Sequence, residues 1–184
     1  MLKLHLPLND DIEINGKQYK INASFDTILR VIKLSNNNAI NITTKTKRCL
    51  FELINDELEH ISDKGRVTAI SAILKRYMEQ KESKPILRDI TGEEIVLEED
   101  EPKKLIDFDV DAERIYSSFI QAYGIDLIDM QGKLHWHKFK ALLNGLPEDT
   151  ALMQVIRIRQ YDPNEENLDA KIRKTQLRDK YTLD

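Results

Sequence analysis

Two histidines are the residues in this chain whose spacing first suggests chemistry. His135 and His137 flank the single tryptophan in the stretch KLHWHKFKALLNGLPEDT, residues 133–150. Histidine is the commonest metal ligand and a frequent general base. A helix brings two histidines onto one ion when they lie three or four residues apart. At about 100° per residue, a pair two residues apart points roughly 200° apart, so a helix excludes chelation here, whereas a strand would align the two rings.

The residues after the histidines favour the helix. Residues 142–145 read Leu-Leu-Asn-Gly, which is typical of a helix that ends on a left-handed residue, and Pro147 suits the first turn of a second helix. The first helix would turn His135 to its apolar face and His137 to its solvent face. We therefore predict that His135 is packed, and that Trp136 anchors the core or an interface.

Other sequence signatures of catalysis are missing. The chain contains no GxxxxGK[ST], GxGxxG, HExxH or GxSxG motif, and its six glycines are few for a phosphate-binding loop. Cys49, the single cysteine, is expected on the polar edge of its helix beside Glu52 and Asp56, whose charges would raise the thiol pKa. The sequence thus predicts no catalytic residue, no metal site and no cofactor, and a protein that is not an enzyme.

Composition bounds the cellular setting. The 184 residues carry a net charge of -4, with 41% hydrophobic residues, near the usual value, and 33% charged residues, above it. These values indicate a soluble protein of one domain, or of one domain with a loosely attached appendage. An acidic chain has no overall attraction to nucleic acid or to an anionic membrane. A single cysteine forms no internal disulfide, and the sequence shows neither a signal peptide nor an apolar run of about 18 residues. We expect a cytoplasmic protein without a membrane span.

The elements that must position these residues begin with a β-hairpin. Residues 12–21 alternate apolar and polar side chains around Asn15-Gly16, a strong signal for a two-residue turn, and residues 2–6 suit a third strand. A lone hairpin is marginal in water, so a helix capped by Ser24 is expected to cover it. After that helix, two apolar stripes separated by a cap at Ser62-Asp63 predict a helical hairpin. The stripes are Leu50, Leu53, Ile54, Leu58 and Ile61, then Val67, Ile70, Leu74, Tyr77 and Met78.

The second half is separated from the first by a charged segment. Residues 85–107 lose the periodicity and centre on EEDEPKK, which predicts an acidic solvated linker, although residues 86–97 also fit a short hairpin. Beyond it, apolar spacing predicts helices over 112–123, ended by Gly124, and over 151–160, and a last helix from Asp162-Pro163.

These elements define the expected fold class. The chain is predicted to be mainly α (α+β), with an N-terminal β-hairpin packed on a multi-helix bundle. Its expected parts are residues 1–84, the acidic linker 85–107 and a helical region over 108–184, and they also suit one compact domain.

A few side chains are candidates for contact with a partner protein. They are Trp136, Phe139, Arg157, Arg159 and Tyr161. Aromatic rings and arginines are enriched in interfaces, and the two arginines interrupt an apolar stripe as in a helix that packs on another chain. Arginine stems that cover the chain's own core explain the same pattern equally well. The basic segment 171–180 suits either a solvated helix or docking on an acidic partner or on RNA.

Longer patterns resemble a known family. FDVDAERIYSSFIQAYGIDL (108–127), LHWHKFKALLNGLPEDT (134–150) and IRIRQYD (156–162) resemble bacteriophage proteins named after gene product fifteen, found in long-tailed phages and prophages of Gram-positive bacteria. The resemblance is close over 108–162 and looser over 14–32. Between these stretches it is one of length and helical character. The family's usual aromatic residue after the tryptophan is replaced by His137.

The resemblance implies a tail-assembly chaperone. Such a protein coats the long tape-measure protein, recruits tail-tube subunits, and leaves before the virion matures. It would act in the host bacterial cytoplasm, and the family has no catalytic residues to transfer to this chain. A homo-oligomer is also compatible with the sequence. The alternatives are a structural component of the tail or head-tail joint, and a nucleic-acid-binding phage regulator that uses the basic C-terminal segment.

Overall fold

The fold consists of helices and one small sheet. The structure, a computed structural model, describes residues 4–78, 105–160 and 168–183. The predicted mainly α fold with an N-terminal β-hairpin is confirmed. The expected hairpin at 86–97, most of the linker and Asp162-Pro163 lie outside the described residues. The elements are β1 (Asp11–Ile14), β2 (Lys17–Lys20), α1 (Phe25–Asn36), α2 (Ile42–Ile54), α3 (Asp63–Met78), α4 (Ala112–Tyr123), α5 (Trp136–Asn144), α6 (Ala151–Gln160) and α7 (Leu168–Tyr181).

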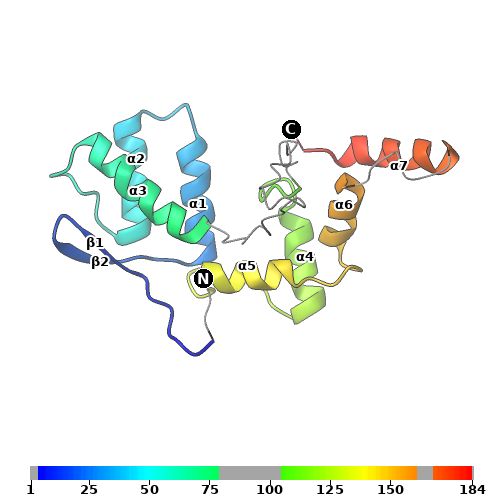
Figure 1. The fold of residues 1–184 in the computed structure, drawn as a ribbon, viewed down its shortest axis with the longest axis horizontal. Helices are drawn as coiled ribbons and strands as arrows, with labels where there is room; N and C mark the ends of the chain where they lie inside the picture. The colour runs from blue at the N-terminus through cyan, green and yellow to red at the C-terminus, as the bar shows by residue number, and fades with distance from the viewer. Residues whose placement is uncertain (1–3, 79–104, 161–167, 184) are drawn as a thin grey trace, which may run out of the picture.

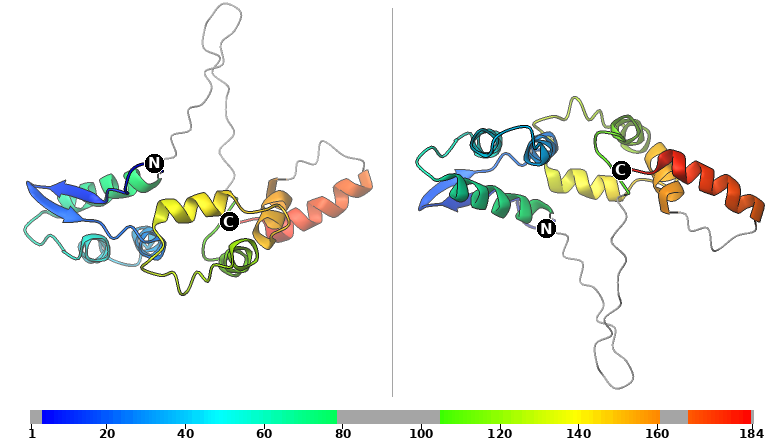
Figure 2. Two further views of the ribbon diagram at one scale, coloured as in Figure 1. Left: turned by 90° about the horizontal axis from the view of Figure 1, so that it is seen from below. Right: turned by 90° about the horizontal axis from the view of Figure 1, so that it is seen from above.

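Helix α5 lies between two groups of elements. The hairpin and α1 to α3 are on one side of it, and α4, α6 and α7 are on the other (Figure 1). Views from below and above show the same arrangement (Figure 2). Buried side chains from both groups form one hydrophobic core, so the described parts of 1–84 and 108–184 pack on each other. No helix in the described part is long and apolar enough to cross a membrane.

The β-hairpin forms where the sequence predicts it. Asn15 and Gly16 both have positive φ, at 49° and 79°, as a two-residue turn of this kind requires, and Ile12 pairs with Tyr19, whose ring is buried. The expected third strand is wrong for residues 4–6, which form a turn. The outer edge of β1 is already used, because Arg76 of α3 donates to the backbone carbonyls of residues 9 and 11.

Helix α2 ends earlier than its apolar stripe suggests. Asn55 adopts a left-handed conformation with φ 54°, which asparagine tolerates, and its N–H donates to the Phe51 carbonyl. The chain then turns Leu58 into the core from a loop, with the Leu58 N–H donating to Asp56 Oδ1 at 2.8 Å. The prediction that Leu58 and Ile61 continue the helix is therefore wrong, although Leu58 is a core residue.

Helix α3 is capped by residues 62–63 as predicted, but it presents a different face to the core. Its buried residues are Arg66, Ile70, Ile73 and Tyr77, whereas Val67 and Met78 are exposed. Arg66 donates to the carbonyls of Leu58 and Ile61, in the loop between α2 and α3. A buried arginine thus lies on the core-facing side of α3, and a search for apolar stripes in the sequence does not detect it.

The corner between α5 and α6 is also built differently. Gly145 has a φ of -96°, so the predicted left-handed ending is wrong. Its N–H donates to Ala141 and Leu142, and Tyr123 Oη donates to the Leu142 carbonyl at 2.8 Å, so these helix-end carbonyls are satisfied without that conformation. A Cβ at residue 145 would meet Tyr123 Oη at 3.3 Å, which explains the glycine. Helix α6 covers the predicted residues 151–160, so the prediction that Pro147 occupies its first turn is wrong.

Candidate partner-binding surface

The histidine pair caps a helix. His135 has extended backbone angles, φ -63° and ψ 142°, and precedes the first helical residue, Trp136. The assumption that both histidines lie within the helix was wrong, and their rings are 5.2 Å apart. The backbone N–H of His137 donates to His135 Nδ1 at 3.0 Å, and His135 Nε2 faces Asp10 Oδ1 at 3.0 Å. Nδ1 of His135 therefore accepts a hydrogen bond and its Nε2–H donates one, so neither ring nitrogen is free to bind a metal ion.

This cap belongs to a polar network that holds three segments together. Tyr77 Oη, at the end of α3, donates to the same Asp10 oxygen at 2.8 Å. Burial, and then the bond to Asp10, raise the Tyr77 pKa. His137 is half buried beside the Tyr77 ring, at 5.4 Å, and not on the solvent face as predicted. Burial, and after it the charges of His135 and Lys140, lower the His137 pKa to about 4. No three metal-ligating side chains cluster in the described residues.

The two aromatic candidates for partner contact lie inside the chain. Trp136 and Phe139 are each 1% exposed. Phe139 stacks between Phe25 of α1, at 4.9 Å, and Phe119 of α4, at 5.4 Å, so α5 joins both groups of elements through one ring. Trp136 Nε1 donates to the Tyr77 carbonyl at 3.0 Å. Both residues are therefore core anchors, and neither side chain is accessible to a partner in this structure.

The arginine candidates separate into one buried and one exposed residue. Arg159 donates two hydrogen bonds to the buried carboxylate of Asp111, at 2.7 and 2.9 Å. Asp111 immediately precedes α4, and so this ion pair fixes α6 to the start of α4. Burial alone raises the Asp111 pKa, but the Arg159 bonds outweigh it and hold that pKa below its usual value. Arg157 is exposed, and Tyr161 lies outside the described residues.

Cys49 is a core residue and not an edge residue as predicted. It is 1% exposed, and its Sγ lies 3.7 Å from Ser35 Oγ of α1. Burial is the largest cause of the raised thiol pKa, and the charge of Glu52 raises it less. The expected direction of the pKa shift holds, but its main cause is packing against α1.

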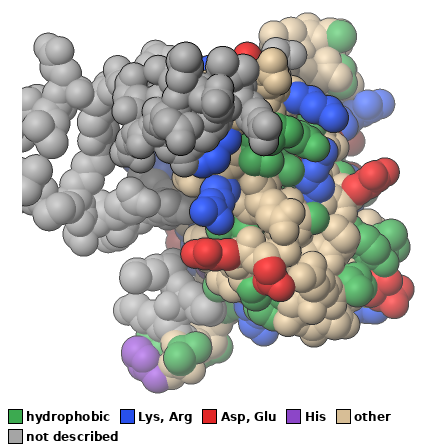
Figure 3. All heavy atoms as spheres, turned by 90° about the vertical axis from the view of Figure 1, so that its right-hand side faces the viewer, with side chains coloured by type: hydrophobic (Ala, Val, Ile, Leu, Met, Phe, Trp, Pro, Cys, Tyr) green, Lys and Arg blue, Asp and Glu red, His purple; other side chains and the backbone are tan. Residues whose placement is uncertain are grey.

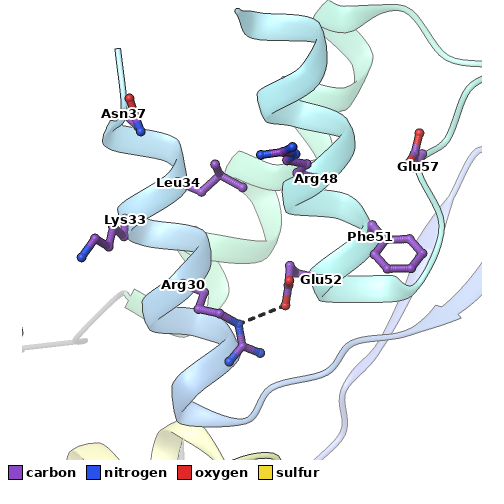
Figure 4. Close-up of a pocket in the computed structure, with 8 residues that line it drawn as sticks. All are labelled: Arg30, Lys33, Leu34, Asn37, Arg48, Phe51, Glu52 and Glu57. Atoms are coloured by element: carbon purple, nitrogen blue, oxygen red, sulfur yellow. Dashed lines mark hydrogen bonds and ion pairs between the residues drawn. The ribbon is translucent and has the colours of Figure 1, made fainter. Parts of the chain in front are cut away.

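An accessible surface that could contact a partner lies instead between α1 and α2. A groove of about 500 Å³ opens there. Leu34 of α1 and Arg48 of α2 point toward each other across it, and Phe51 lies one turn further along α2 (Figure 4). Phe51 is 54% exposed, whereas Leu50 and Leu53, which belong to the apolar stripe of the same helix, are fully buried.

The charges around this α1–α2 groove are mostly paired within the chain. Arg30 Nε donates to Glu52 Oε2 at 3.1 Å, and a second bond joins Arg30 to Asp26. Burial alone lowers the Arg30 pKa, but these two carboxylates outweigh it and raise that pKa. Glu57 faces Lys47 at 3.6 Å. Within the described ranges, no carboxylate pairs with Arg48, so the groove keeps one unmatched positive charge.

A second groove flanks α1 on its other side. It has a volume of about 690 Å³ and lies between α1 and the residues before α4, where Leu29, Ile32 and Phe108 are half buried. Two of its charged residues, Lys33 and Asp109, already pair at 2.9 Å. The side of the molecule that carries α6 and α7 differs, because hydrophobic, basic and acidic side chains are intermixed there (Figure 3).

The α1–α2 groove is the feature that sequence reasoning missed. Leu34, Arg48 and Phe51 were not among the candidate residues. One signal was available: Phe51 falls outside the apolar stripe of α2, on a helix whose stripe is already complete. An aromatic residue on the polar face of a helix is a candidate for contact because it gains nothing from the chain's own core.

Comparison with known proteins shows the family. The family described as Bacteriophage Gp15 protein matches residues 4–183, which includes the hairpin, the α1–α2 groove and the helices around α5. No curated protein and no solved structure matches the chain. Because the family match covers almost the whole length, the chain belongs to the bacteriophage Gp15 protein family.

Proposed function

We propose that this chain is a non-enzymatic tail-assembly chaperone. It binds the tape-measure protein and tail-tube subunits in the host bacterial cytoplasm while the phage tail is built, and it is absent from the mature virion. Family membership supports a phage role. The observation that carries the finer proposal is the open groove between α1 and α2, which exposed Phe51 and half-buried Leu34 both line.

This groove has the features that binding a helical partner requires. Amphipathic helices dock into grooves through apolar residues at helical spacing, and charged residues around the contact set orientation and partner choice. The groove is open and of modest size, and it combines an aromatic side chain with charged side chains from both walls. Such a contact suits a chaperone, which must bind its client and later release it.

Co-expression with the tape-measure protein of the same phage tests the proposal. We expect the tape-measure protein to stay soluble and to co-purify with this chain, because exposed apolar helix faces would be covered. Expression of the tape-measure protein alone, and with an unrelated helical protein, gives the matched controls. Equal insolubility in all three cultures, with no co-purification, would contradict the chaperone role.

Mass spectrometry of purified virions tests the second part of the proposal. We expect this chain to be missing from virions that contain the tube and tape-measure proteins in normal amounts. A stoichiometric amount in the virion would favour the structural alternative, a component of the tail or of the head-tail joint.

A further inference from the structure

We propose that the α1–α2 groove binds an amphipathic helix whose apolar stripe is flanked by acidic residues. This inference rests on the proposed function, since it names the site and the chemistry by which the chaperone would hold its client. It commits to one occupant, a helix with a negative charge placed opposite Arg48.

The apolar half of this inference comes from Phe51. The stripe of α2 is complete without it, because Thr46, Cys49, Leu50, Leu53 and Ile54 are all buried. Phe51 is 54% exposed and shares the groove with half-buried Leu34 of the facing helix. Exposed aromatic rings in a concave site are typical anchors for a partner, because a partner's side chains can cover them fully. An apolar stripe on the occupant would supply that cover.

The helical form of the occupant follows from the walls of the groove. Two helices, α1 and α2, form its sides, and its volume of about 500 Å³ is within the range of ordinary binding sites. Grooves between helices accept a third helix through ridges of side chains at three- and four-residue spacing.

The acidic flank follows from the distribution of charge. Arg30 and Lys33 have carboxylate partners in the chain, and so do not need one from an occupant. Arg48 is exposed, points into the groove, and pairs with no carboxylate in residues 4–78, 105–160 or 168–183 (Figure 4). An occupant that covers Phe51 would take Arg48 out of water, which is unfavourable unless the occupant supplies a negative charge. An acidic residue beside the apolar stripe provides that charge.

A pair of synthetic peptides tests the charge preference. One is a fluorescent helical peptide of about 18 residues, with leucines at i, i+4, i+7 and i+11 and glutamates beside them, and the other has lysines in place of the glutamates. Fluorescence anisotropy gives the two dissociation constants. We expect the wild-type chain to bind the glutamate peptide about fivefold more tightly than the lysine peptide. Equal binding, or no binding of either peptide, would overturn the proposal.

Variants at exposed positions identify the site of binding. Arg48→Glu is expected to reverse the preference, so that the lysine peptide binds more tightly. Phe51→Ala is expected to weaken both peptides by about tenfold. The controls are Lys138→Glu and Ile128→Ala, an exposed cation and an exposed apolar residue away from the groove, which should leave both constants unchanged. Wild-type-like binding by Arg48→Glu and Phe51→Ala would place the peptides elsewhere and refute the inference.

Co-purification with the tape-measure protein separates this inference from the proposed function. If the wild-type chain retains the tape-measure protein but Arg48→Glu and Phe51→Ala lose it, both are supported. If all three retain it, the chaperone function stands and the groove is not its binding site. If the wild-type chain does not retain it, the proposed function fails, and the peptide constants alone decide what the groove binds.

Discussion

Replacing Arg159 by methionine removes the most buried charge contact between the α4 and α6 segments. The guanidinium donates to both carboxylate oxygens of Asp111, to the Leu105 carbonyl at 2.7 Å and to the Tyr181 carbonyl at 2.5 Å. The side chains of Arg159 and Asp111 are 4% and 0% exposed. Methionine keeps the aliphatic volume but leaves the Asp111 carboxylate buried, with Arg114 and the Asp107 N–H as its remaining donors.

The expected cost of this change is large. Removing one partner of a buried ion pair costs about 3–5 kcal/mol, because the remaining buried charge loses its main compensation, and here only Arg114 and the Asp107 N–H are left to Asp111. A domain of this size has a free energy of unfolding of about 5–15 kcal/mol, so the loss is a large fraction of it. The melting temperature should fall by about 6–20 °C. At pH 7 the full contribution is present, because the lowered Asp111 pKa makes the pair weaken only as the pH falls through that pKa.

Urea unfolding followed by circular dichroism measures this cost. Arg157→Met is the matched control, since Arg157 lies on the same helix and is exposed, and we expect it to change the free energy of unfolding by less than about 0.5 kcal/mol. If Arg159→Met and Arg157→Met have the same unfolding midpoint within error, the ion pair does not stabilise the fold and the reasoning is refuted.

Four further outcomes are expected. The His137 pKa is lowered to about 4, so between pH 6.5 and 4 the unfolded chain binds a proton that the folded chain does not. The free energy of unfolding should therefore fall by up to about 3 kcal/mol as the pH falls through this window. His137→Phe should make the urea midpoint less dependent on pH. Trp136→Ala should cost about 3–5 kcal/mol in urea unfolding, whereas Phe51→Ala should cost under about 0.5 kcal/mol; similar costs would contradict the burial pattern. The buried Cys49 thiol should react with a thiol reagent only after urea unfolds the chain, and rapid reaction of the native protein would show that the core opens there. Gly16→Ala should destabilise the hairpin by about 1 kcal/mol, because φ is 79° at this position, and calorimetry checks it.

Sequence reasoning succeeded where the signal is local. Asn15-Gly16 predicts its turn because the required backbone angles suit those two residue types and few others. Gly124 ends α4 where predicted, in the left-handed conformation that glycine adopts readily, and the periodicity of residues 112–123 gives that helix its bounds. Each of these features depends on residues that are neighbours in the sequence.

It failed where a distant residue decides the local structure. The stripe through Leu58 continues at helical spacing, but the left-handed Asn55 ends the helix, and Arg66 from α3 donates to the Leu58 and Ile61 carbonyls of the loop that follows. His135 reads as a helical residue, yet its ring serves as the cap and its other nitrogen faces Asp10, far away in the sequence. The bond from Arg159 to Asp111 spans 48 positions. Periodicity carries no information about such contacts.

The candidate surface was missed for a related reason. The predicted partner contacts were the aromatic and arginine side chains between residues 136 and 161. These residues lie within the range 108–162, which resembles the family most closely. In the structure those residues join α5 to both groups of elements, through the stacked ring of Phe139 and the bond from Trp136 to Tyr77. They are therefore needed for folding whatever the protein binds.

This division of roles decides which variants are informative about function. A substitution at Trp136, Phe139 or Arg159 would destabilise the fold, so a loss of the proposed partner binding in such a variant would not locate an interface. Arg48 and Phe51 are exposed and make no large contribution to the core, so a loss of binding at these two positions reports on contact itself. The partner surface of this chain should therefore be sought between α1 and α2, outside the stretch that most strongly marks the family.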